Sequence, residues 1–275
     1  MSGTLYIVAT PIGHLADMTF RAVDTLKAVD WIACEDTRQT RKLLDHYGID
    51  KPLISYHEHN ERERSPQLIE RLENGSSGAL VSDAGTPLVS DPGYRLVNAA
   101  IERGVALVPI PGASAVIAAL SVSGLPTDSF RFGGFLPRKS GERRSLLASL
   151  SADPATLVFY EAPHRMPEAL ADIADLMQDP TVVCARELTK IHEEILRGKA
   201  SEVREILASR PAIKGEFTLL IAPRDLHEEH AGSPPETVRM LEAQGYSRMD
   251  AIKEAARRHG LPKREVYRLV ESSES

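Results

Sequence analysis

The stretch VSDAGTPLVSDPG, residues 81–93, follows a short apolar run that is typical of a buried strand. It holds two aspartates, two glycines and two prolines, and few of its residues favour a helix or a strand. Glycine permits backbone dihedrals that other residues avoid, and proline fixes its own φ angle. The stretch therefore predicts a rigid turn. Because ligands of open parallel sheets bind beyond the carboxyl ends of the strands, this turn is a candidate binding loop.

The sequence on both sides of this loop alternates between strand and helix patterns. Continuous apolar runs, typical of strands buried on both faces, occur at residues 5–10, 31–34, 79–82 and 105–110. Helical patterns lie between them at residues 19–29 and 94–104. The alternation predicts an α/β domain with a mostly parallel sheet and helices on both of its faces.

A second α/β domain and a helical tail are predicted beyond a linker rich in helix breakers, SGLPTDSF at residues 123–130. A helical pattern lies near residues 141–150, and strand patterns occur at 131–137, 156–162, 181–188 and 217–223. The polar, turn-rich segment HEEHAGSPPE, residues 227–236, then separates these patterns from the last part of the chain. The predicted organisation is an N-terminal domain at 1–123, a C-terminal domain at 124–226 and a tail at 233–275.

The tail reads as three short helices that resemble a helix-turn-helix. Ser247 is the expected N-cap of the second helix and Gly260 its stop, and Pro262 lies in the first turn of the third. The residues expected to form its small apolar core are Ile252, Ala255, Ala256, Val266 and Leu269.

Composition describes an ordinary globular protein. Of its 275 residues 42% are hydrophobic and 26% are charged, which is enough to build a sizeable core. The two cysteines, Cys34 and Cys184, lie far apart in apolar runs, so they predict neither a disulfide framework nor a metal site and fit a reducing cytoplasm. We expect no signal peptide, no membrane span and no metal. The net charge of −6 excludes a wholly basic coat but not local basic patches.

Two more loops of the same kind follow strands, ATPIG at residues 9–13 and PIPGASA at 109–115. Three such loops on one edge of a sheet favour a shared ligand over three unrelated tight turns. The fingerprints of dinucleotide-binding and P-loop proteins are absent. The small residues of PIPGASA open a helix whose free amides suit an anion or an adenosine group. From the residues alone, the prediction is a rigid cleft for a nucleoside-like or anionic small molecule.

Ordered motifs over nearly the whole chain resemble those of the small-subunit ribosomal RNA methyltransferase I family, which belongs to the tetrapyrrole methylase superfamily. They comprise the opening TLYIVATPIGHLADMTFRAVDTLKAVDWIACEDTRQTRKLL, and then SDAGTPLVSDPG, PIPGASA, GFLPRK, FYEAPHR, ARELTK and KGEFTL. The resemblance implies two α/β domains of the tetrapyrrole methylase type with S-adenosylmethionine in the cleft between them, and a homodimer. It also implies methylation of the ribose 2′-hydroxyl of a decoding-centre cytidine in the 16S rRNA of the small ribosomal subunit.

The same resemblance implies a set of cofactor-binding residues. Aspartate and threonine side chains suit the polar groups of the cofactor, and glycine leaves room for its sulfonium. The set comprises Pro11, Asp83, Gly85, Thr86, Ser114 and Ala115 from the first domain, and Tyr160, Leu188 and Thr218 from the second.

Catalytic candidates come from three motifs. Glu35 and Asp36 form an acidic pair at the end of the second strand, where Asp36 suits a proton acceptor or, equally well, a helix N-cap. His164 and Lys190 lie in FYEAPHR and ARELTK of the facing domain. Each of these residues also has a purely structural interpretation.

Basic residues in three places suit RNA phosphates. In residues 130–145, five basic side chains accompany Phe132 and Phe135, which we expect in the core. A solvated helix face is the competing interpretation for the basic residues of the tail. The candidate RNA-binding residues are Arg38, Arg41, Arg138, Lys139, Arg143, Arg144, Lys263, Arg264 and Arg268.

Two other functions remain open from the sequence. A methylase of a tetrapyrrole or cobalamin precursor shares the fold and the cofactor, but needs neither the basic loop nor the tail. A ribosome-binding module without catalytic activity retains the cleft. Methyl transfer to small subunits, compared with transfer to a corrinoid precursor, separates the three.

Overall fold

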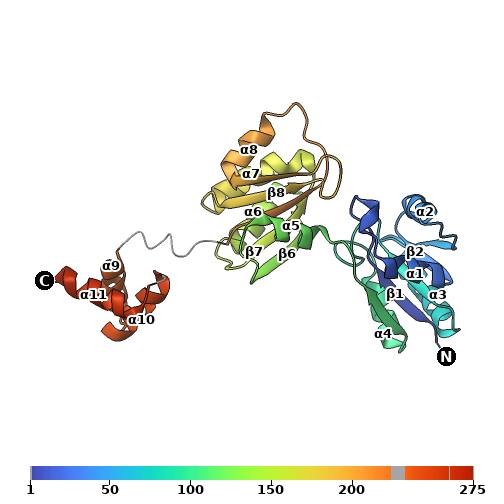
Figure 1. The fold of residues 1–275 in the computed structure, drawn as a ribbon, viewed down its shortest axis with the longest axis horizontal. Coiled ribbons are helices and arrows are strands. Elements are labelled where there is room, and N and C mark those ends of the chain that lie inside the picture. The colour runs from blue at the N-terminus through green and yellow to red at the C-terminus, as the bar shows by residue number, and fades with distance from the viewer. Residues whose placement is uncertain (1, 224–232, 260, 275) are drawn as a thin grey trace. The chain divides into compact units, whose positions relative to one another are not determined.

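The structure is a computed structural model that describes residues 2–223, 233–259 and 261–274. The chain divides into two compact units, Met1–Pro223 and Arg224–Ser275 (Figure 1). Within its described residues, the first unit holds two five-stranded sheets and the second holds helices.

The first sheet is parallel throughout, with the strand order β3-β2-β4-β1-β5. Its buried strands are rich in Val, Ile, Leu and Ala, as expected when both faces of a sheet are covered. Parallel strands of this kind all present their carboxyl ends at one edge. The strands are β1 (Thr4–Val8), β2 (Trp31–Cys34), β3 (Leu53–Ser55), β4 (Gly78–Val81) and β5 (Ala106–Ile110).

Helices cover both faces of this sheet. On one face α1 (Phe20–Ala28) and α2 (Thr37–His46) bury Leu26 and Leu44 against β2 and β4. On the other face α3 (Glu61–Glu73) and α4 (Tyr94–Glu102) bury Leu68, Leu72 and Leu96. The predicted layering of the first domain is confirmed. One detail is wrong: β5 is an edge strand with exposed residues, so it is not buried on both faces.

The second sheet has the order β6-β7-β10-β8-β9 and mixed strand directions. β6 and β7 are parallel, whereas β10 is antiparallel to both of its neighbours and β9 is antiparallel to β8. Its strands are β6 (Phe130–Phe135), β7 (Thr156–Glu161), β8 (Thr181–Arg186), β9 (Glu194–Lys199) and β10 (Phe217–Ile221). The α/β prediction for this domain is confirmed, but β9 was not predicted.

Different helices cover the two faces of the second sheet. One face packs against α6 (Ser140–Leu150), α7 (Met166–Leu176) and α8 (Ala200–Ala208). The opposite face carries Val158, Val183 and Leu220, which pack against α5 (Ala115–Ser123). Gly124, in the left-handed region at φ 77°, ends α5. α5 therefore precedes the expected boundary at residues 123–124, yet it packs on the second sheet.

The second unit consists of α9 (Pro234–Ala243), α10 (Arg248–Arg258) and α11 (Lys263–Glu274), which enclose a small core of their own. Ser247 caps α10 as predicted, since its hydroxyl accepts from the N–H of Asp250. Val270 is buried and Leu269 is 38% exposed, so the core position is one residue later than predicted. The predicted stop at Gly260, residues 227–232 of the expected linker and residues 224–226 of the second domain lie outside the described residues.

Candidate functional site

A cavity of about 410 Å³ lies among the loops at the carboxyl edge of the first sheet and the facing surface of the second sheet. Both predicted domains contribute to its lining. Pro11 is buried beside the cavity, and the next residue, Ile12, lines it instead. The structure brings together the other predicted cofactor residues, Asp83, Gly85, Thr86, Ser114, Ala115, Tyr160, Leu188 and Thr218, in this lining.

Backbone hydrogen bonds tie the loop after β4 to the loop after β1. Thr10 and Gly85 exchange two such bonds of 2.8 and 3.1 Å. Gly85 has a φ of 86°, a conformation that glycine adopts without the strain that other residues incur. The Ser82 hydroxyl donates to the Gly85 carbonyl at 3.1 Å and fixes the same turn from within.

The loop at residues 83–93 is strained as well as rigid. Leu88 and Ser90 adopt positive φ angles of 72° and 66°, each of which costs of order 1–3 kcal/mol. Gly93 has a φ of 141°, and a Cβ placed there would lie 2.8 Å from Leu80 Cδ2. A backbone held in such conformations is over-determined by its surroundings, as is common at binding sites.

The second sheet contributes a row of side chains. Thr218 on β10 stands opposite Tyr160 on β7 and Ala185 on β8. On the same face of the sheet, α5 covers the neighbouring row of side chains, Val158, Leu220 and Val183. The row that contains Thr218 is therefore left to line the cavity. The Tyr160 ring packs edge-on against Phe132 and Phe135, with centroids 5.0 and 5.5 Å apart. The expectation that Phe135 belongs to the core is wrong, since it is 58% exposed and lines the cavity.

Lys190 is one catalytic candidate that lines the cavity. Its ammonium donates to Glu187 at 2.8 Å and to Glu216 at 2.9 Å. Burial alone lowers the pKa of Lys190, but these two carboxylates outweigh it and raise the pKa above its ordinary value. Lys190 therefore stays protonated at neutral pH and is unsuited to accept a proton.

Asp36 and His164 do not line the cavity. Asp36 is the N-cap of α2, because its Oδ1 accepts from the N–H of Arg38 at 2.8 Å. The Arg38 guanidinium and this N–H hold the pKa of Asp36 below its usual range. His164 is exposed in the 3-10 turn η2 (Pro163–Arg165). For Asp36 the structure favours the N-cap interpretation over that of a proton acceptor.

Asp91, which the sequence did not single out, and Glu161, one of the charged residues of FYEAPHR, also line the cavity. Burial, followed by the charges of Glu35 and Asp83, raises the pKa of Asp91 to about 6. Burial also raises the pKa of Glu161, against the opposing effect of Arg165. Asp91 is the second aspartate of the turn at residues 81–93, so the motif that pointed to Asp83 also contained the sequence evidence for Asp91.

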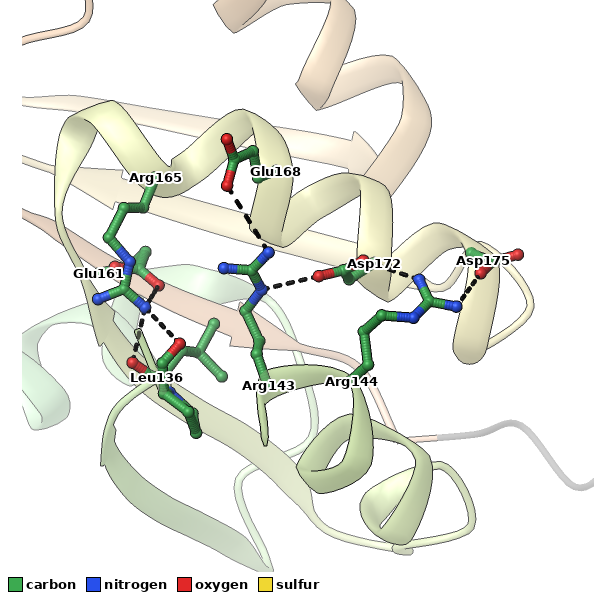
Figure 2. Close-up of polar contacts among 9 residues, drawn as sticks. Leu136, Arg143, Arg144, Glu161, Arg165, Glu168, Asp172 and Asp175 are labelled. Atoms are coloured by element: carbon green, nitrogen blue, oxygen red, sulfur yellow. Dashed lines mark hydrogen bonds and ion pairs between the residues drawn. The ribbon is translucent and has the colours of Figure 1, made fainter. Parts of the chain in front are cut away.

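Glu161 is held from outside the cavity by Arg165. Nη2 of Arg165 donates to the carbonyls of Leu136 and Pro137, both at 2.7 Å, and lies 3.1 Å from Glu161 Oε2 (Figure 2). Since this nitrogen carries two hydrogens, the two carbonyls use both of them. The guanidinium thereby joins the cavity wall to the backbone that precedes Arg138 and Lys139.

Arg143 does not fit the RNA-binding expectation. Its side chain is 4% exposed, and Nε lies 2.7 Å from Asp172 Oδ2. Figure 2 shows it extending from α6 to α7, where Glu168 lies 3.8 Å from its other end. Because its side chain is buried and its charge is paired with Asp172 inside the fold, Arg143 is a structural residue and is absent from the surface that RNA can reach.

The other basic candidates differ in their exposure and in the acidic residues that they contact. Arg138 and Lys139 are exposed, and Lys139 contacts Glu142. Arg144 is partly exposed and bound by Asp172 and Asp175. The remaining candidates lie on two helices: Arg38 and Arg41 on α2 contact Asp36 and Asp50, and Lys263, Arg264 and Arg268 are exposed on α11.

Residues 2–223, 233–259 and 261–274 contain neither a metal-ligand cluster nor a membrane-spanning helix. No group of three or more His, Cys, Asp or Glu side chains is arranged to hold a metal ion. No helix there has the length and apolar character that crossing a membrane requires.

Comparison with known proteins identifies the family. The family model described as tetrapyrrole (corrin/porphyrin) methylases matches residues 4–204. A curated relative from Halalkalibacterium halodurans, named ribosomal RNA small subunit methyltransferase I, is 48% identical over 274 residues, covering 97% of this chain and 94% of the relative. The chain belongs to the ribosomal RNA small subunit methyltransferase I family.

Further relatives of the same name support this assignment. The protein from Mesorhizobium japonicum is 48% identical, with 97% of this chain and 90% of the relative covered. The protein from Synechocystis is 47% identical, with 97% of each chain covered. The family that the motifs predicted is confirmed.

Solved structures confirm the fold. A crystal structure of diphthine synthase superposes with a TM-score of 0.62 at 17% identity, covering 80% of this chain and 90% of that one. A uroporphyrin-III-C-methyltransferase from Thermus thermophilus gives a TM-score of 0.57 at 17% identity, covering 80% and 94%. The predicted tetrapyrrole methylase fold is confirmed.

Proposed function

We propose that this protein transfers a methyl group from S-adenosylmethionine to the ribose 2′-hydroxyl of a decoding-centre cytidine in the 16S rRNA of the small ribosomal subunit. The observation that carries the proposal is the cavity, in which the family's motifs from both α/β domains meet. The curated relatives act, by their name, on small-subunit ribosomal RNA. Their name specifies neither the 2′-hydroxyl nor the cytidine, so these two features are part of the proposal alone.

The residues present in the cavity fit the cofactor. Its donors and acceptors include the carboxylate of Asp83 and the hydroxyl of Thr218, which suit amino and ribose hydroxyl groups. Carboxylates and the rings of Phe135 and Tyr160 attract a cation such as a sulfonium. When bound, the cofactor supplies an electrophilic methyl group. The strained loop at 83–93 holds the site still, as the alignment of a displacement reaction requires.

RNA binding is proposed for the exposed basic residues outside the cavity. Arg138 and Lys139 follow directly on the backbone that Arg165 ties to Glu161 in the cavity wall. A phosphate bound there would be held at a fixed place relative to the methyl donor. Arg38, Arg41, Arg144 and the α11 residues Lys263, Arg264 and Arg268 complete the proposed contacts, and Arg143 is left out because it is buried.

The proposal is tested by transfer of a labelled methyl group to small subunits from cells that lack this protein. A 2′-O-methylated ribose cannot form the cyclic phosphate through which alkali cleaves RNA, so the label should remain in alkali-resistant dinucleotides. Label in single nucleotides would move the methylation to a base. A corrinoid precursor tested in parallel should remain unlabelled.

Other outcomes separate the competing functions. Label in the corrinoid but not in the subunit would favour a tetrapyrrole-type methylase. Binding to subunits without any transfer would favour a silent ribosome-binding module. We also propose that the enzyme works as a homodimer in the cytoplasm, where small subunits assemble. Sedimentation equilibrium measures the mass of the assembly in solution, and the mass of a single chain would contradict the dimer.

A further inference from the structure

Asp91 lines the cavity on the part of the loop that approaches the second sheet. It follows Ser90, whose backbone is in the left-handed region, and precedes the turn at Gly93. These two conformations fix the C-terminal end of the loop at residues 83–93. Ser90 Oγ lies 3.5 Å from the place that a Cβ on Gly134 of β6 would take, so the loop closely approaches the second sheet here. Asp91 therefore lies where the two α/β domains meet around the cavity.

The charges around Asp91 are of its own sign. Burial is the largest cause that raises the pKa of Asp91 to about 6, and the negative charges of Glu35, after β2, and Asp83, in the same loop, add to it. Hydrogen bonding to Ser82 opposes them and is outweighed. Across the cavity, burial and then the charge of Asp91 raise the pKa of Tyr160. A carboxylate among carboxylates relieves repulsion when it takes up a proton.

Each of the other carboxylates of the cavity is bound by a hydrogen-bond donor or lies against a cation. Asp83 accepts from the backbone N–H of Asp36 at 3.1 Å. Burial raises the pKa of Glu161, but the N–H of Ala162 and the Arg165 guanidinium, 3.1 Å away, favour its ionised carboxylate. Glu216 is bound to the Lys190 ammonium at 2.9 Å, and Lys190 is itself held protonated. A general base works best when it is ionised at the working pH yet as basic as that condition allows.

We propose that Asp91 is the general base that accepts the proton of the attacking ribose hydroxyl. This inference rests on the proposed function. As the O–H bond breaks, the proton passes to the Asp91 carboxylate and the ribose oxygen forms its bond to the methyl carbon. The carbon–sulfur bond breaks, and its electron pair stays on sulfur. The sulfonium and the carboxylate are both neutral at the end, so charge balances.

The first test measures Asp91 without any reaction. With the aspartate carboxyl carbons labelled with ¹³C, the resonance that disappears in Asp91→Asn should titrate near pH 6 in the free protein. Glu35→Gln removes one of the two neighbouring negative charges, so the same resonance should titrate at a lower pH. An Asp91 resonance that titrates near pH 4, or that Glu35→Gln leaves unmoved, would overturn the proposal.

The second test measures single-turnover methylation of small subunits between pH 5.5 and 8.5. Wild-type protein should lose rate as the pH falls through about 6, because Asp91 becomes protonated. Asp91→Asn should react about 100- to 10,000-fold more slowly, without this acidic limb, and bind the cofactor with wild-type affinity. Glu35→Gln should shift the limb to lower pH and lower the plateau rate modestly, because a carboxylate of lower pKa is a weaker base.

Distinct results would assign Asp91 another role. Loss of cofactor affinity in Asp91→Asn, measured by calorimetry, would make Asp91 a cofactor ligand and overturn its role as base. An acidic limb that disappears in Glu161→Gln but persists in Asp91→Asn would move that role to Glu161. Failure of the proposed function itself looks different, since wild-type protein would then leave subunits unmethylated at every pH.

Discussion

The backbone N–H of Asp36 donates a hydrogen bond to Oδ1 of Asp83 over 3.1 Å. The two residues are 47 positions apart in sequence, but each follows the carboxyl end of one of two neighbouring strands, β2 and β4. Asp36 also caps α2 through its own side chain. One residue thus begins a helix and orients the carboxylate that lines the cavity, so Asp36 positions Asp83.

Replacing Asp83 by Ala should weaken S-adenosylmethionine binding about 10- to 100-fold, as expected for the loss of a hydrogen bond to a charged group. The loop itself should stay folded, because the bonds between Thr10 and Gly85 are made by the backbone. Titration calorimetry measures the affinity, and circular dichroism checks the fold. Asp128→Ala, an exposed carboxylate between α5 and β6, is the matched control and should bind normally. Equal affinities for the two variants would remove Asp83 from the site.

Arg143→Ala should destabilise the second domain by about 3 kcal/mol, at the low end of the range for a broken buried ion pair. It leaves Asp172 buried with Arg144 as its remaining cationic contact, 2.8 Å away. Arg138→Ala, five residues earlier and exposed, should change the unfolding free energy by less than about 0.5 kcal/mol. Urea unfolding of both variants measures the difference. Normal stability of Arg143→Ala with lost subunit binding would return Arg143 to the RNA surface.

The helical periodicity of the sequence around Arg143 already indicates that its side chain is buried. Arg143, Leu147 and Leu150 are spaced by four and three residues, and all three are buried on one face of α6. Reading residues 130–145 as a basic run ignored that phase. The mixed directions of the second sheet could not be predicted in the same way, because apolar runs such as 181–188 and 217–223 do not state which neighbour a strand pairs with.

Replacing Arg138 and Lys139 together by Ala should weaken binding to small subunits and leave cofactor affinity unchanged. Each lost phosphate contact removes counterion release, so the slope of log K against log salt should become shallower by roughly one unit per contact. The control is the charge-matched pair Lys27→Ala and Arg204→Ala, exposed on α1 and α8. If the salt slope were the same in both double variants, Arg138 and Lys139 would be an ordinary solvated surface.

Lys190→Met should cost about 1 kcal/mol of stability at pH 7, because it leaves Glu187 and Glu216 without their shared cation. The pKa of Lys190 is raised, so its contribution is complete below its unfolded pKa and disappears only as the pH rises through the higher folded value. The pKa of Glu187 is lowered by its bond to Lys190, so its contribution disappears as the pH falls below about 4.5.

Unfolding of wild type and Lys190→Met at pH 4, 7 and 9 tests this assignment. The difference in unfolding free energy should be similar at pH 7 and 9 and smaller at pH 4. Lys214→Met, an exposed lysine two residues before Glu216, serves as the control and should be neutral throughout. A difference that vanishes between pH 7 and 9 would mean that Lys190 loses its proton there, which would revive it as a proton acceptor.

How much of the site could be predicted depended on where its residues stand relative to strand ends. Asp83, Tyr160 and Thr218 lie at or beyond a strand end that meets the cavity, and the motifs that follow strands point to them. Glu161 could be named only as one of several charged residues of FYEAPHR, because an acidic residue in a strand pattern carries no sign of burial. Phe135 was misplaced because a β-bulge after Phe132 shifts the register, and alternation along the strand does not reveal it.

Deleting residues 233–275 should leave the remaining chain folded with normal affinity for S-adenosylmethionine. The division between the two compact units falls after Pro223, and the cavity-lining residues belong to the first unit. The tail buries Val238, Leu241, Ile252 and Val266 within its own helices, so it has an apolar core of its own. Thermal unfolding and titration calorimetry of the truncated protein check both expectations.

Methylation by the truncated protein should nevertheless require higher concentrations of small subunits, since Lys263, Arg264 and Arg268 are lost with α11. The full-length triple Ala variant at these positions is the matched comparison, because it removes three charges and keeps the helices. KM should rise in both proteins, while kcat, which depends on the intact cavity, should change little. A rise in KM that appears only on deletion would assign the effect to the shape of the tail. Unchanged kinetics in both would make its basic face ordinary solvation, and loss of cofactor affinity would show that the first unit needs the tail to fold.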